Sequence, residues 1–151
     1  MAKRLSSHLD ANKILNKFQF GLRINHSTSL ALTNVIDNIL EHLDNYKHVT
    51  GTHLQKAFDT VNHRILLYKL HNYGVHGIAN EWFCSNVPDR YQLTCVNQAE
   101  SDMHEINCGV PQGSVLGPLL FLVYVNDISN AVPDLNVKLF ADDTNLLLGL
   151  H

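Results

Sequence analysis

The segment "NVKLFADDTNLLLGLH", residues 136–151, places two adjacent carboxylates between two apolar runs. Asp142 and Asp143 carry like charges that repel each other, and aspartate is a poor strand residue. Two interpretations of the pair are open. It can lie in a turn and simply face water, or its hard oxygen atoms can bind a divalent cation.

Histidine and cysteine give less evidence of a metal site. The ten histidines are scattered along the chain, with no H-x-x-x-H pair on a convincing helix. Cys84, Cys95 and Cys108 form no C-x-x-C pair, so neither a cysteine zinc site nor a disulfide framework is indicated. The start of the chain also lacks the apolar run of a signal peptide. We therefore expect an intracellular protein, in the nucleus or cytoplasm, with buried thiols.

The two aspartates need elements that hold them in place. Strand-like runs on either side of the pair predict a β-hairpin with Asp142 and Asp143 at its tip. Upstream, apolar residues at helical spacing predict helices over residues 27–43, 62–74 and 77–86. Ser27 or Thr28 can cap the first helix, and Asn62 can cap the second, which Gly74 ends.

The middle of the chain adds strands and a sharp turn. Alternating residues over 90–98 and 104–110 predict two antiparallel strands joined by a polar turn at 99–102. Gly109, Pro111 and Gly113 then predict a sharp backbone turn. Ser114 can cap an apolar helix that begins near it, with Pro118 in the first turn. Helices outnumber strands and the strands form hairpins, so the predicted fold class is α+β.

Length and composition limit the function classes. The chain has 151 residues, 45% of them hydrophobic and 17% charged, which predicts one globular domain over residues 1–151. The formal net charge of −3 provides no basic excess, which argues against tight nucleic-acid binding. The longest apolar stretch, residues 115–125, is too short to cross a bilayer, so no membrane association is expected.

Five motifs in a fixed order then carry a family resemblance. They are "FQFGLRINHST" (18–28), "KAFDTVNH" (56–63), "WFCSNVPDRYQ" (82–92), "GVPQGSVLGPLLF" (109–121) and "FADD" (140–143). Together they resemble the reverse transcriptase, an RNA-directed DNA polymerase, of non-LTR retrotransposons of the LINE-like, jockey or CR1 type. The resemblance covers nearly the whole chain.

The resemblance implies a partial right-hand polymerase palm with part of the fingers, the thumb being absent. Asp142 and Asp143 would be the catalytic carboxylates and the ligands of Mg²⁺ or Mn²⁺, which stabilise the attacking and leaving oxygens in nucleotidyl transfer. Phe58 and the segment from Pro111 through Gln112 to Gly113 would contact the nucleotide and the template. An RNA template, a DNA primer and deoxynucleotides are the implied partners, while the oligomeric state is not predicted.

The chain departs from the family at one position that matters chemically. Relatives have the pattern D-h-x-K-A-F, with a catalytic aspartate five residues before the phenylalanine, and that position here is His53. A neutral imidazole offers one nitrogen lone pair to a metal that prefers oxygen, so it cannot bridge two cations as a carboxylate does. Asp59 is not expected to replace it, because strand alternation would turn it away from the metal. We expect a truncated, degenerate copy with impaired catalysis.

Two alternatives to an impaired polymerase remain. The chain can be a non-enzymatic remnant of a retrotransposon that binds nucleic acid or a protein, or a histidine-rich metal-binding protein. Salt-dependent binding to a primer–template would separate the last reading from the others. Nucleotide incorporation would separate the enzyme from the binding module.

Overall fold

The computed structural model describes residues 1–17, 19–21, 27–44, 48–53, 57–111, 113–131, 136–140 and 143–150. These form helices and small antiparallel sheets, in agreement with the predicted mixture of helices and hairpins. The helices are α1 (Ala2–Ala11), α2 (Thr28–Asp44), the 3₁₀ helix η1 (Ala57–Thr60), α3 (His63–Asn72), α4 (Ile78–Asn86), α5 (Gly117–Val125) and α6 (Ile128–Ala131). The strands are β1 (His48–His53), β2 (Arg90–Gln92), β3 (Cys95–Val96), β4 (Ala99–Glu100), β5 (His104–Ile106), β6 (Asn136–Phe140) and β7 (Asp143–Leu150).

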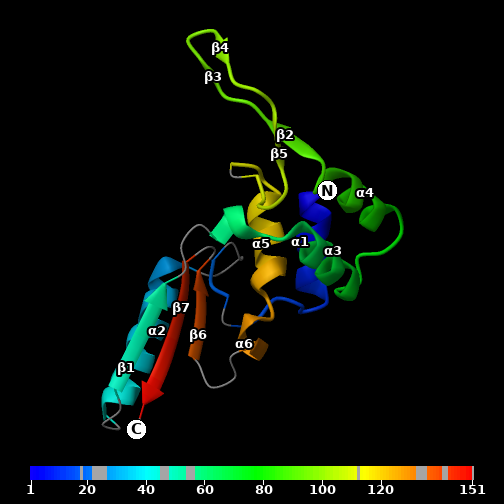
Figure 1. The fold of residues 1–151 in the computed structure, drawn as a ribbon. Helices are drawn as coiled ribbons and strands as arrows, with labels where there is room; N and C mark the ends of the chain where they lie inside the picture. Colours follow the sequence, from blue (N-terminus) through cyan, green and yellow to red (C-terminus); the bar gives the residue numbers. More distant parts are fainter. Residues whose placement is uncertain are drawn as a thin grey trace.

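The hydrophobic core lies among the helices. α3 contacts both α4 and α5, and α1 lies beside them (Figure 1). α5 is apolar on all its faces, and most of its residues are buried. A helix of this kind is stable only when other elements cover it on several sides. The largest fully buried apolar side chains of this core are Leu9, Leu66, Leu70, Phe83 and Phe121.

Local capping explains where α2 and α3 begin, and both predictions are confirmed. The Ser27 hydroxyl accepts a hydrogen bond from the Leu30 amide at 3.2 Å. The Asn62 side chain accepts one from the Ile65 amide at 3.1 Å. Each side chain accepts from the amide three residues further on, which has no hydrogen-bond partner within the helix.

A three-stranded sheet lies apart from this core, beside α2 (Figure 1). Its strand order is β1-β7-β6, and both pairs are antiparallel. β6 and β7 form the predicted hairpin around residues 141–142, which lie outside the described residues. α2 contacts both β1 and β6, yet Leu32, Ile36 and Leu40 on this helix are 60%, 44% and 51% exposed.

The β2–β5 segment projects from the helical core as a long hairpin (Figure 1). The predicted turn at 99–102 is wrong, because Ala99–Glu100 is strand β4 and pairs with Cys95–Val96. The chain reverses at Asn97 and Gln98, whose φ angles are +48° and +68°. Such angles are those of a two-residue hairpin turn, which asparagine tolerates better than most residues.

The three cysteines are free, and the expectation of buried thiols is wrong. All three are exposed. Cys95 lies on the projecting hairpin, and Cys84 lies on α4, where only Phe83 is fully buried. Cys84 thus lies on the side of α4 away from the core, and Cys108 is exposed on the segment that follows β5.

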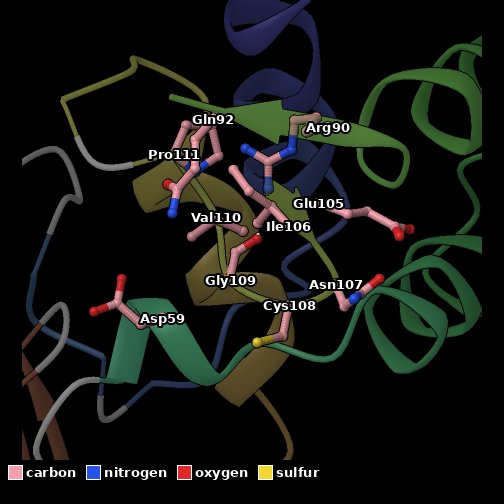
Figure 2. Close-up of a pocket in the computed structure, with 10 residues that line it drawn as sticks. All are labelled: Asp59, Arg90, Gln92, Glu105, Ile106, Asn107, Cys108, Gly109, Val110 and Pro111. Atoms are coloured by element: carbon pink, nitrogen blue, oxygen red, sulfur yellow. Dashed lines mark hydrogen bonds between the residues drawn. The ribbon is translucent and has the colours of Figure 1, made fainter. Parts of the chain in front are cut away.

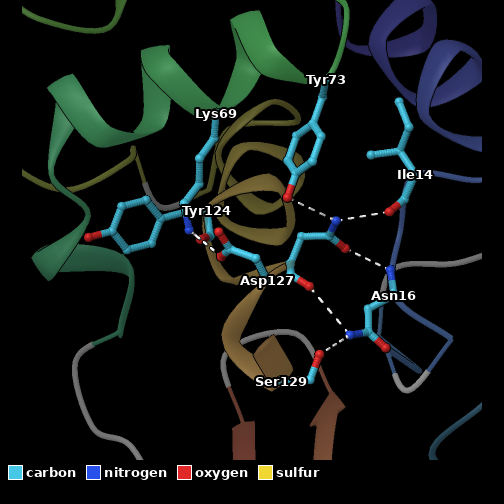
Figure 3. A network of polar contacts seen from close by, with 8 residues as sticks. Ile14, Asn16, Lys69, Tyr73, Tyr124, Asp127 and Ser129 are labelled. Atoms are coloured by element: carbon cyan, nitrogen blue, oxygen red, sulfur yellow. Dashed lines mark hydrogen bonds and ion pairs between the residues drawn. The ribbon is translucent and has the colours of Figure 1, made fainter. Parts of the chain in front are cut away.

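Polar contacts fasten the segment after α1 to the end of α5 (Figure 3). The Asn126 amide group donates to the carbonyl of Ile14 at 2.9 Å and to the Tyr73 hydroxyl at 3.2 Å. Its side-chain oxygen accepts from the Asn16 amide at 2.7 Å. Nearby, Lys69 forms an ion pair with Asp127 and donates to the carbonyl of Tyr124.

Within the part of the chain described above, no helix is both long and apolar enough to span a bilayer.

Candidate active site

The strand that carries His53 lies next to the strand that begins with Asp143. In β1 and β7 the register partners are His53 and Asn145, and Asp143 pairs with Phe140 of β6. Asp143 is therefore a diagonal neighbour of His53 across two hydrogen-bonded strands, a separation of roughly 7–8 Å. The sheet thus brings together two positions that are 90 residues apart in the sequence (143 − 53). Asp142 lies outside the described residues.

A second set of candidate residues follows β5, where the chain passes close to η1 (Figure 2). The Gly109 amide donates to the carbonyl of Val61 at 2.8 Å, and the Val110 amide donates to that of Phe58 at 2.9 Å. Gly109 has a φ of +86°, and a Cβ atom there would lie 3.0 Å from the Asp59 Cα. Only glycine meets both conditions, because it has no Cβ and adopts positive φ at little cost.

The Gly109 carbonyl is held by two donors from distant parts of the chain. The buried His63 ring donates from Nε2 at 2.8 Å, and the Arg90 guanidinium donates from Nη2 at 2.8 Å. Arg90 is itself fixed by a bond from its Nε to the carbonyl of Val87 at 3.0 Å. These contacts set the direction in which the chain leaves β5 and enters the turn that follows.

The turn from Pro111 to Gly113 is anchored against α5. The Ser114 hydroxyl donates to the Pro111 carbonyl at 2.8 Å and accepts from the Gly117 amide at 2.9 Å. Ser114 therefore caps the first helical amide as predicted, although α5 begins at Gly117. A Cβ atom on Gly117 would lie 2.3 Å from the Pro111 carbonyl oxygen, so this close approach also requires glycine. Gly113 has a φ of +77°, and Gln112 lies outside the described residues.

An open hollow of about 590 Å³ lies beside this turn (Figure 2). β2 and β5, the segment that follows β5, and Asp59 of η1 line it. Arg90 and Gln92 bring donor groups, whereas Asp59 and Glu105 bring carboxylates. The wall thus carries both signs of charge rather than a uniformly basic surface.

Phe58 lies at the boundary between this site and the core. Its ring is partly buried and packs against Phe121 of α5, with ring centroids 4.7 Å apart and planes 34° apart. Residues 57–60 form a 3₁₀ helix and not a strand. The expectation that strand alternation turns Asp59 away from the metal is therefore wrong, because it assumed a strand. Strand periodicity does not apply to a segment that closes i to i+3 hydrogen bonds.

Donor chemistry bears on whether a divalent cation suits the sheet site. Over the described ranges, no three His, Cys, Asp or Glu residues gather into a group that could hold a metal. The carboxylates at positions 142 and 143 are oxygen donors of the kind that magnesium prefers. The imidazole at position 53 is not, although β1 places it on the strand beside Asp143.

Comparison with known proteins decides the family. Residues 1–149 match the family described as reverse transcriptase (RNA-dependent DNA polymerase). The chain belongs to the reverse transcriptase family. The match ends at residue 149, within β7, so it covers the helical core and nearly all of the three-stranded sheet.

The similar curated proteins are polymerases of mobile elements. The RNA-directed DNA polymerase from mobile element jockey of Drosophila melanogaster is 35% identical over 95% of this chain and 17% of its own length. The probable RNA-directed DNA polymerase from transposon BS of the same species is 33% identical over 100% of this chain and 16% of its own length. The predicted relation to non-LTR, LINE-like reverse transcriptases is confirmed, and the chain spans about one-sixth of these relatives.

In this reverse transcriptase chain, the candidate residues lie in two places. Asp143 lies on the sheet, whereas Phe58 lies on η1, and Pro111 and Gly113 lie in the turn before α5. Sequence reasoning missed His63 and Arg90, which hold the Gly109 carbonyl. His63 is the last residue of the motif "KAFDTVNH", which was the signal that the sequence offered, whereas its burial is seen only in the structure.

Proposed function

We propose that residues 1–151 form part of one reverse transcriptase domain, contributing the palm and part of the fingers of a right-hand polymerase. Its substrates would be an RNA template, a DNA primer and deoxynucleotides, as the names of the similar proteins suggest. The observation that carries the proposal is the strand order β1-β7-β6, because it sets position 53 beside the strand that starts at Asp143. Two-metal catalysis requires ligands gathered at one point, and here two separate strands bring positions 53 and 143 together.

In this proposal Asp142 and Asp143 would hold Mg²⁺ or Mn²⁺. A bound cation of that kind would supply charge stabilisation to the attacking and leaving oxygens. Pro111, Gln112 and Gly113 would contact the nucleotide and template, supported by the fixed Gly109 carbonyl and the close packing on Gly117. The Phe58 ring would lie near the sugar of the nucleotide, and its contact with the Phe121 ring would hold it in place.

His53 is the reason to expect impaired catalysis. Two cations at one site carry four positive charges, and bridging carboxylates normally offset part of that charge. An imidazole brings no negative charge and a single nitrogen donor. With His53 at this position, the aspartate pair would have to hold the cations with less charge and fewer oxygen ligands.

Metal titration of the purified chain tests the assignment of the sheet site. His53→Asp should raise Mn²⁺ affinity in calorimetry by about tenfold or more, because ligand charge and number are main determinants of affinity for hard cations. His48→Asp, at the other end of β1 opposite Leu150, makes the same charge change away from the hairpin and is the matched control. Equal affinities for the two variants would remove the sheet site from consideration.

A second candidate function is binding without catalysis. The same histidine at position 53 favours it, since a remnant that lost a metal ligand can still hold a primer–template or a protein. Its affinity for nucleic acid would depend on local cationic groups, because the formal net charge is −3. Salt-dependent primer–template binding together with absent incorporation would support this candidate over the polymerase.

A further inference from the structure

Two exposed histidines face each other across the connection between α3 and α4. His71 lies in the last turn of α3, and His76 lies just before α4 begins. Their Nδ1 atoms are 3.3 Å apart, and the ring centroids are 4.5 Å apart with an interplanar angle of 71°. Their separation of five residues is not the helical i, i+4 spacing that a search for paired histidines would recognise.

The backbone explains why these two rings meet. α3 ends in a Schellman motif, in which the Gly74 amide bonds to the His71 carbonyl and the Val75 amide bonds to the Leu70 carbonyl, both at 3.0 Å. Gly74 has the left-handed φ of +85° that this motif needs. Leu70 and Val75 are buried in the core, so the turn is fixed from below. The fold therefore fixes the backbone positions from which the two histidine side chains extend.

The spacing of the Nδ1 atoms suits one metal ion. Two nitrogens bound at about 2.0–2.1 Å lie roughly 3.3–3.4 Å apart on a tetrahedral ion such as Zn²⁺ and roughly 2.9 Å apart at cis positions of a square-planar or octahedral ion such as Ni²⁺, so either ion needs at most a small rotation of the rings. We propose that His71 and His76 form a two-imidazole site for a borderline divalent transition metal such as Zn²⁺ or Ni²⁺, bound through Nδ1 of each ring. A hydrogen bond between two neutral rings needs one Nδ1–H donor, and on metal binding its proton would move to Nε2 of the same ring, so the step would release no proton.

The surroundings determine how such a site behaves. Over the described ranges, no third His, Cys, Asp or Glu completes a group with this pair, so water would fill the remaining positions. His8 is already engaged at this turn, because its Nε2–H donates to the Tyr73 carbonyl at 2.8 Å. Arg4 lines the same hollow as His76 and opposes a cation there. The site should therefore bind reversibly and prefer imidazole-seeking metals over Mg²⁺.

Calorimetry of the whole chain with Ni²⁺, in excess Mg²⁺, tests the proposal. Mg²⁺ prefers oxygen ligands, so it should occupy any carboxylate site and leave this pair open. His71→Gln and His76→Gln should each lower Ni²⁺ affinity by at least about tenfold, the lower end of what losing even an indirect partner of a metal ligand costs. His104→Gln, an exposed histidine on β5, is the matched control and should leave the affinity within about twofold.

A local measurement separates this site from the other histidines. Paramagnetic Ni²⁺ should broaden the amide signals of Gly74, Val75 and Gly77 in the unsubstituted protein before those of β5. The broadening should disappear in the His71→Gln/His76→Gln double variant, whose circular dichroism should match that of the unsubstituted protein. Affinity that survives in the double variant, or full displacement of Ni²⁺ by Mg²⁺, would overturn the proposal.

Discussion

Substituting Gly109 by alanine should destabilise the protein more than the same change at Gly113. Both glycines have positive φ, +86° and +77°, so both variants bear the strain of a left-handed alanine, about 1–2 kcal/mol. Only at Gly109 would the new Cβ meet neighbours, at 3.0 Å from the Asp59 Cα and 3.1 Å from the Phe58 carbonyl oxygen. These are backbone atoms of η1, which cannot rotate away as a flexible side chain can.

The extra contact sets the expected difference. Overpacking a fitted site typically costs about 1–3 kcal/mol, so Gly109→Ala should lose about 2–5 kcal/mol and Gly113→Ala about 1–2 kcal/mol. Urea unfolding followed by circular dichroism and by fluorescence of the single tryptophan, Trp82 on α4, measures both losses. If the two variants unfold at the same urea concentration with equal slopes, the segment after β5 does not lie as close to η1 as described.

Three further predictions concern the same framework. Gly117→Ala should destabilise by about 1–3 kcal/mol in urea, although alanine favours a helix, because its Cβ would lie 2.3 Å from the Pro111 carbonyl oxygen; a gain in stability would contradict this packing. Asn126→Ala should cost about 2–3 kcal/mol, since it removes three hydrogen bonds, while Asn130→Ala, at an exposed position, should stay within about 0.5 kcal/mol. A thiol reagent should titrate all three cysteines rapidly in the native protein, and a thiol that reacts only after unfolding would show that it is buried.

Local features of this fold were predictable, because their causes are local. Asn62 caps α3 through an amide three residues away, and Gly74 ends the helix through its own φ angle. The predicted turn at 99–102 missed the true reversal at Asn97 and Gln98. A polar stretch offers several possible turns, and tertiary context selects one of them. The 3₁₀ helix at Phe58 was missed for a similar reason, because it forms where the chain meets the segment after β5.

The candidate site was predictable only in part. The hairpin around the aspartates follows from two apolar runs, and its pairing with β1 agrees with the family pattern. The hold on the Gly109 carbonyl was not predictable, since His63 and Arg90 lie 46 and 19 residues away in sequence. The facing of His71 and His76 likewise depends on the shape of a helix end, which residue spacing alone does not reveal.

Primer extension by the unsubstituted chain tests most directly whether His53 leaves this member of the reverse transcriptase family without effective catalysis. The assay uses purified protein, a primed RNA template, deoxynucleotides and Mg²⁺ or Mn²⁺, with an active reverse transcriptase in parallel. We predict no metal-dependent incorporation above the level of the Asp142→Asn variant, because position 53 lacks the carboxylate that two cations require. Robust extension by the unsubstituted chain that Asp142→Asn abolishes would contradict the proposed impairment.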